Sequence, residues 1–169
     1  DTQYNYIDDI RLSRGSRNIL YTTDGNWTES EFYDDGWSLD WNNQYSASVS
    51  FNSEYVSLYT QGYEGGGYDE YIQSPVFTTD EKGMVQFEWQ EYVPGAYYYW
   101  RERVEVSING GEYTDVYFRD LANCESYLED DYADWNNRIA TLGFLEEGDT
   151  FELRLNPFQN QGNSWGHTV

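Results

Sequence analysis

The stretch Val104-Glu105-Val106-Ser107-Ile108-Asn109-Gly110-Gly111 decides the fold class. Up to Ile108 its apolar residues alternate with polar ones, and this period of two places alternate side chains on opposite faces of a β-strand. An Asn-Gly pair after such a run is a strong signal for a hairpin turn, so residues 112–118 are expected to form the returning strand. The segment predicts an antiparallel hairpin with one face on a core and one in water.

The same alternation recurs in residues 47–51, 85–89 and 151–155, and Gly-containing turn sequences at 80–83 and 146–149 separate such segments. Eight or more short strands at this spacing predict an all-β, two-sheet jelly-roll sandwich. The residues expected to point inward are Val85, Phe87, Trp89, Val104, Val106, Ile108, Phe151, Leu153 and Leu155.

Composition limits the partners of the chain. Its 169 residues suit one domain. With 31 acidic and 9 basic residues the net charge is −22, which disfavours nucleic acid and anionic membrane surfaces and favours bound cations. Aromatic residues make up 20% of the chain, which argues against disorder.

Location is predicted to be extracellular or at a cell surface. The sequence has no apolar run long enough to span a membrane, and it begins at Asp1, as a processed chain or an excerpt would. Asn26-Trp27-Thr28 is a glycosylation sequon, which makes Asn26 a candidate for modification. Cys124 stands alone, so no internal disulfide can form, and a buried thiol is expected.

Catalysis has few residues to draw on. His167 is the sole histidine, which argues against a Ser–His–Asp triad and against a site built from several histidines. We therefore expect the chain not to be an enzyme.

Six or more short motifs occur in an order that resembles the MAM-like jelly rolls and related domains of bacterial surface proteins. The resemblance spans roughly 130 residues. The motifs are Phe32-Tyr33-Asp34-Asp35-Gly36-Trp37, Glu54-Tyr55-Val56-Ser57-Leu58-Tyr59, Ile72-Gln73-Ser74-Pro75-Val76-Phe77, residues 85–89 and 104–111, Trp135 with Leu142, and residues 148–155.

One motif is displaced. Domains of this kind end with a Trp followed by an Ile-Asp-Asp-Ile strand, whereas here Trp165-Gly166 lies near the C-terminus and the matching strand, Tyr6-Ile7-Asp8-Asp9-Ile10-Arg11-Leu12, lies near the N-terminus. Residues 1–12 are thus expected to be a donated or permuted strand, residues 13–30 a connector with the first strand, and residues 31–169 the jelly-roll body.

Three arrangements would fill the resulting slot in the sandwich. The strand folds into its own body as a circular permutant, it fills the slot of a neighbouring copy, or the chain is one repeat of a tandem array. In the second case the donor strand would present Tyr6, Ile7, Ile10 and Leu12 to the neighbour.

The resemblance also implies a calcium site. In such domains a cation lies where the acidic opening motif meets the final Asp-Asp, and calcium prefers several oxygen ligands. Carried over, the ligands would be Asp8, Asp9, Asp34 and Asp35, with Asp69 as a further candidate. The alternative is that these are solvated loop carboxylates.

The function predicted from sequence is a non-catalytic structural subunit or repeat of an extracellular filament or cell-surface array. Copies would join head-to-tail by strand complementation and be stabilised by Ca²⁺. The alternative is a carbohydrate-binding module of a secreted glycan-active protein. In that case Tyr97, Tyr98, Tyr99 and Trp100 are candidates for stacking on sugar rings.

Overall fold

A computed structural model of the chain describes residues 2–14, 18–22, 27–40, 47–51, 56–61, 71–92, 101–120 and 136–156. These residues form two antiparallel sheets, here called sheet A and sheet B. Sheet A has the order β11 (Asn136–Leu145), β8 (Gly83–Tyr92), β1 (Thr2–Arg14), β5 (Val56–Gln61) and β4 (Ala47–Phe51), and β2 (Asn18–Thr22) pairs with β1. Sheet B has the order β10 (Thr114–Asp120), β9 (Arg101–Ile108), β12 (Thr150–Asn156), β6 (Tyr71–Gln73) and β3 (Ser38–Asp40), and β7 (Phe77–Thr78) pairs with β12.

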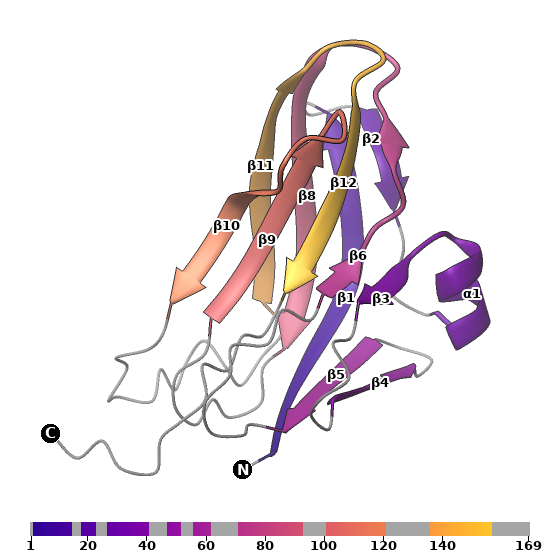
Figure 1. The fold of residues 1–169 in the computed structure, drawn as a ribbon, viewed down its shortest axis with the longest axis vertical. Coiled ribbons are helices and arrows are strands. Elements are labelled where there is room, and N and C mark those ends of the chain that lie inside the picture. Colours follow the sequence, from indigo (N-terminus) through magenta and orange to yellow (C-terminus); the bar gives the residue numbers. More distant parts are fainter. Residues whose placement is uncertain are drawn as a thin grey trace, which may run out of the picture.

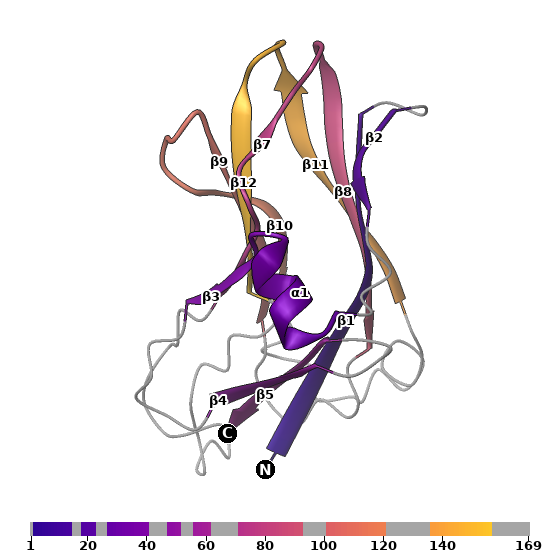
Figure 2. The same ribbon diagram turned by 90° about the vertical axis from the view of Figure 1, so that its right-hand side faces the viewer.

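The two sheets stack face to face as a sandwich, which Figure 2 shows edge-on. The chain crosses between the sheets at each step from β7 to β8, β8 to β9, β10 to β11 and β11 to β12. The edge strands β10 and β11 contact each other along one side, and the helix α1 (Glu29–Asp34) lies at the other side, next to β3 (Figure 1). The prediction of an all-β two-sheet sandwich is confirmed.

The core lies between the sheets and follows the predicted alternation. All of the predicted inward residues are buried except Ile108, which is half-buried and packs against the same core. From sheet A the core also takes Ile10, Leu12, Ala140 and Leu142. Burial of a large apolar side chain contributes about 1.5–3 kcal/mol, so these rows of residues fix which face of each strand is outside.

Strand β1 lies in the middle of sheet A. Its first half pairs with β5, where Ile7 lies opposite Val56, and its second half pairs with β8, where Leu12 lies opposite Phe87. The strand thus pairs within its own chain, and which of the three arrangements weighed from sequence holds between copies stays a prediction. The strand also extends to Arg14, beyond the expected end at residue 12.

Donation of β1 to a neighbouring copy stays a prediction, whereas within the chain β1 pairs with its own β5 and β8. The physical reason is loop closure: a strand tethered to its own slot meets it at high effective concentration, and the entropic cost grows only slowly with loop length. Assembly of copies likewise stays a prediction.

The helix α1 was not predicted from the opening motif. Thr28 caps it in a reciprocal pair of bonds: the Thr28 Oγ1 accepts from the Glu31 backbone N–H at 3.3 Å, and the Glu31 Oε2 accepts from the Thr28 N–H at 2.9 Å. Such a capping box satisfies backbone donors that a helix start leaves open.

The helix ends in a Schellman motif at Gly36. The Trp37 N–H donates to the Phe32 carbonyl at 3.1 Å, the Gly36 N–H donates to the Tyr33 carbonyl at 3.0 Å, and Gly36 has φ of 84°. This turn brings the buried rings of Phe32 and Trp37 to a centroid distance of 6.1 Å, and Trp27 packs on both of them. The helix thus fastens an aromatic cluster to the core.

Three turns are joined at one end of the sandwich. The Asn109 side chain donates to Asp149 Oδ1 at 2.9 Å and accepts from the Thr150 N–H at 2.9 Å. The Thr79 hydroxyl donates to the carbonyls of Glu146 and Asp149. These bonds hold the ends of β9 and β12 together and so fix the register of sheet B.

Candidate ligand-binding face

The outer face of sheet B gathers aromatic rings, guanidinium groups and carboxylates. Because Val104, Val106, Leu153 and Leu155 point to the core, the residues between them on β9 and β12 lie on the opposite face. Arg154 lies opposite Glu105 in one pairing and opposite Gln73 in the other, so β6, β12 and β9 contribute to one row. We call the following residues the sheet-B face: Tyr71, Gln73, Arg103, Glu105, Tyr113, Asp115, Phe118, Glu152 and Arg154.

Arg154 lies near two tyrosine rings of this face. Its guanidinium carbon is 3.7 Å from the ring centroid of Tyr113 and 5.0 Å from that of Tyr71. Its Nε donates to Gln73 Oε1 at 3.3 Å, and Gln73 Nε2 donates to Glu152 Oε2 at 3.1 Å. A guanidinium stacked on aromatic rings keeps its orientation, so these side chains are arranged before any ligand arrives.

Tyr113 belongs to the same network. Burial, and next the nearby Glu152 carboxylate, raise the pKa of Tyr113 from 10.0 to about 12, although the nearby charge of Arg154 acts in the opposite direction. The phenol therefore stays protonated at ordinary pH.

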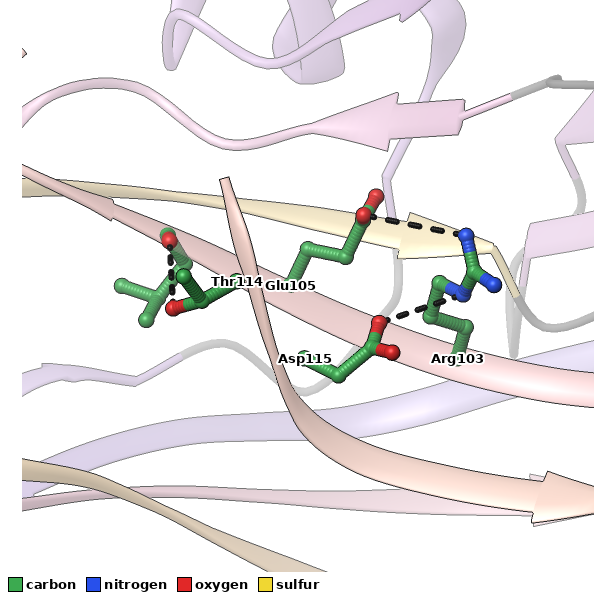
Figure 3. Close-up of polar contacts among 5 residues, drawn as sticks. Arg103, Glu105, Thr114 and Asp115 are labelled. Atoms are coloured by element: carbon green, nitrogen blue, oxygen red, sulfur yellow. Dashed lines mark hydrogen bonds and ion pairs between the residues drawn. The ribbon is translucent and has the colours of Figure 1, made fainter. Parts of the chain in front are cut away.

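Arg103 forms a second charged group on this face. Its Nε lies 3.1 Å from Asp115 Oδ1 and its Nη1 lies 3.8 Å from Glu105 Oε1 (Figure 3). Its guanidinium carbon is 5.7 Å from the ring centroid of Phe118, which is exposed. Next to Asp115, the Thr114 hydroxyl donates to the Val106 carbonyl at 3.5 Å. Both arginines of the sheet-B face thus lie near aromatic rings, Arg154 near two tyrosines and Arg103 near Phe118.

The charges of the sheet-B face nearly balance. Two arginines stand against three carboxylates, those of Glu105, Asp115 and Glu152, which leaves one net negative charge on the face while the whole chain carries −22. The face offers hydrogen-bond donors from arginine and glutamine, acceptors from the carboxylates, and ring faces from tyrosine and phenylalanine. This combination suits a polar, uncharged ligand with apolar patches.

The residues predicted to bind calcium are only partly described. Asp34 and Asp35 are exposed at the end of α1, and Asp35 Oδ2 accepts from Trp27 Nε1 at 3.1 Å. Asp8 and Asp9 belong to β1, where the pairing with β8 shifts register between Asp8 and Arg11. The side chains of Asp8 and Asp9, and all of Asp69, lie outside the described residues. Within the described ranges, no three His, Cys, Asp or Glu side chains converge on one point.

The calcium site therefore stays a prediction. Asp35 Oδ2 already accepts a hydrogen bond from the Trp27 indole.

Several other predicted residues also lie outside the described part of the chain, namely Asn26, Tyr97, Tyr98, Tyr99, Trp100 and Cys124. The rest of the sequon is described: Trp27 is buried, and the Thr28 hydroxyl donates to Glu31 Oε2 at 2.7 Å within the capping box. Of the proposed donor-strand residues, Ile10 and Leu12 are buried in the core of their own chain.

Comparison with family models, with curated proteins and with solved structures gave no match. The resemblance to MAM-like jelly rolls thus stays a prediction. In the ranges that the structure describes, no helix has the length and apolar character needed to cross a membrane.

Sequence reasoning missed the sheet-B face. The alternation correctly assigned Arg103, Glu105, Glu152 and Arg154 to the outside of their strands, but it treated them as solvated. The available signal was that two separate strands carry both an arginine and a glutamate on their outer faces, which predicts a charge network once the strands are neighbours.

Proposed function

We propose that the chain is a non-catalytic binding module that takes an uncharged glycan on the sheet-B face. The observation that carries the proposal is the placement of Arg154 beside Tyr71 and Tyr113, with Gln73 and Glu152 bonded in the same row.

Sugar rings match the chemistry of this face. Their C–H surfaces pack on aromatic rings, and their hydroxyls both donate and accept hydrogen bonds. Tyr71, Tyr113 and Phe118 supply rings, while Arg154, Gln73 and the carboxylates supply planar polar groups. Because neighbouring side chains already hold these groups, binding costs less conformational entropy than ordering free side chains would.

Charge favours an uncharged ligand over an acidic one. A net charge of −22 repels polyanions at long range, and the two arginines of the face already have carboxylates nearby on the same face. Binding is then governed by short-range contacts, and it should change little with ionic strength. An extracellular or cell-surface location, predicted from the sequence, would bring the module to such glycans.

The filament or surface array predicted from sequence is the second candidate. It no longer draws support from β1, since this strand pairs inside its own chain. The glycan proposal instead rests on side-chain contacts, so we place it first.

The test is retention on a panel of neutral polysaccharides, including β-glucans, xylans, mannans and chitin. The parent chain should bind at least one of them, and Arg154→Gln should weaken that binding by about tenfold or more, since hydrogen bonds to charged groups contribute about 1.5–3 kcal/mol. Arg11→Gln is a matched control, because Arg11 is a half-buried arginine on the other sheet. Lack of retention across the panel, or equal binding by Arg154→Gln, would refute the proposal.

A further inference from the structure

We propose that four tyrosines on the outer face of sheet A form a second carbohydrate-binding site. We call Tyr4, Tyr6, Tyr59 and Tyr92 the tyrosine platform, and they belong to β1, β5 and β8. The platform lies on the other sheet from the sheet-B face, so the inference goes beyond the proposed function and depends on different residues.

A bulge in β1 brings the tyrosines to the outer face. Ile10 is buried in the core, so strict alternation along β1 would place Tyr4 and Tyr6 on the inner face as well. The pairing with β8 instead shifts register before Arg11, where two residues of β1 lie opposite the single residue Trp89. An extra residue of this kind reverses the faces of the residues that precede it.

The register across the strands agrees with this placement. Trp89 is buried, so alternation along β8 puts Tyr92, three residues further, on the outer face. Tyr6 is directly opposite Tyr92, and residues opposite each other in a ladder share a face. Tyr4 therefore lies on the outer face too, and its partner on β5 is Tyr59.

The four positions form one compact surface. The strand β1 lies between β8 and β5 in sheet A (Figure 1). Neighbouring strands are about 4.8 Å apart and alternate residues of a strand about 7 Å apart, so the platform measures about 10 Å by 7 Å. A surface of this size can take a sugar ring in contact with more than one tyrosine, and the C–H face of a sugar packs well on aromatic rings.

The positions around the platform belong to uncharged polar residues. By register and alternation, the outer face there includes Ser48, Ser50, Ser57, Gln61, Gln90 and Asn137. Hydroxyl and amide groups both donate and accept hydrogen bonds, as the hydroxyls of a sugar do. Rings surrounded by such groups suit a ligand that has apolar faces and polar edges.

Charge favours an uncharged sugar at this site. Residues 2–7 and the whole of β4 and β5 contain none of the 31 acidic and 9 basic residues of the chain. Along β1 the first charged position on this face is Asp8, and beyond it Arg11 lies opposite Glu88. Glu54, between β4 and β5, lies outside the described residues. The strands of the platform thus supply no cation next to the tyrosines for the carboxylate of an acidic sugar or for a phosphate.

A second protein copy fits this surface less well than a sugar. Protein–protein interfaces concentrate aromatic residues, methionine and arginine at their centre and are depleted in serine. The platform has the aromatic residues, but serine, glutamine and asparagine surround it. Two copies with a net charge of −22 each would also repel one another.

The test is calorimetric titration of the full chain with soluble oligosaccharides from β-glucan, xylan, mannan and chitin. We expect two bound oligosaccharides per chain for the parent and one for Arg154→Gln, in which the sheet-B face is weakened. In the Arg154→Gln background, Tyr6→Ser, and separately Tyr59→Ser, should weaken the remaining binding by about tenfold or more, because each removes a ring on which the sugar packs. Tyr6→Phe keeps the ring and should weaken binding less than Tyr6→Ser.

The matched control is Tyr33→Ser. Tyr33 is 47% exposed on α1 and belongs to neither sheet face, so its variant should bind like the parent. Circular dichroism confirms folding of each variant, and two platform variants keep the test decisive if one of them fails to fold.

Four results overturn the proposal: no binding to any member of the panel, loss of all binding in Arg154→Gln, platform variants that bind like their background, and platform variants that change only the association state in sedimentation. The last would identify the platform as a protein interface. If instead the platform variants lose binding while Arg154→Gln alone binds like the parent, the platform stands and the sheet-B proposal fails.

Discussion

Replacing Ile10 by alanine tests whether β1 completes the core of its own chain. Ile10 is 1% exposed and belongs to the core cluster, so the substitution removes apolar groups worth about 0.8 kcal/mol per methylene and leaves a cavity behind. Three lost carbons give about 2.4 kcal/mol, and the cavity brings the total loss in free energy of unfolding to about 3–4 kcal/mol. In a domain of this size the Tm should fall by about 6–16 °C.

The assay is denaturant unfolding followed by tryptophan fluorescence. Val76→Ala is the control: Val76 is largely exposed, so its change should stay within about 0.5 kcal/mol. The midpoint of unfolding should not depend on protein concentration, because β1 and its slot are in one chain.

Two results would refute this reasoning. A loss below about 1 kcal/mol for Ile10→Ala would mean that the side chain is not in a packed core. A midpoint that rises with protein concentration would mean that the strand comes from another copy, since binding between chains stabilises by mass action. The second result would restore strand complementation.

The remaining predictions concern single groups. Gly36→Ala should cost about 1–2 kcal/mol in denaturant unfolding, because Gly36 has φ of 84° and an added Cβ would lie 3.1 Å from the Cβ of Pro75. The hydrogen bond from Asn109, and next that from the Glu146 N–H, lower the pKa of Asp149. The ionised carboxylate therefore stabilises the fold above the unfolded-state pKa, and this stabilisation is lost as pH falls through the folded-state pKa. Asp149→Asn should accordingly show a smaller drop in Tm upon acidification than the parent. The pKa of Tyr113 is raised to about 12. The stabilisation of the fold by the protonated phenol is therefore complete below pH 10 and is lost as pH rises toward 12. Tyr113→Phe should remove this loss of stability at alkaline pH in a Tm–pH profile.

The strands were predictable because their signal is local. In Val85–Phe87–Trp89 the alternation of apolar residues decides which face is buried, and all three residues are buried as expected. The helix α1 was missed because six residues are too few to show a helical period. Its capping box, with Thr28 and Glu31 three positions apart, was the one local sign of it.

The sheet-B face was not predictable by the same means. Arg154 and Glu105 are far apart in the sequence, and only the register between β12 and β9 makes them neighbours. Periodicity gives the face on which a residue lies but not the partner across the strand. For β1, the pattern predicts a strand but not whose sheet it joins, because pairing within a chain and pairing between chains use the same backbone bonds.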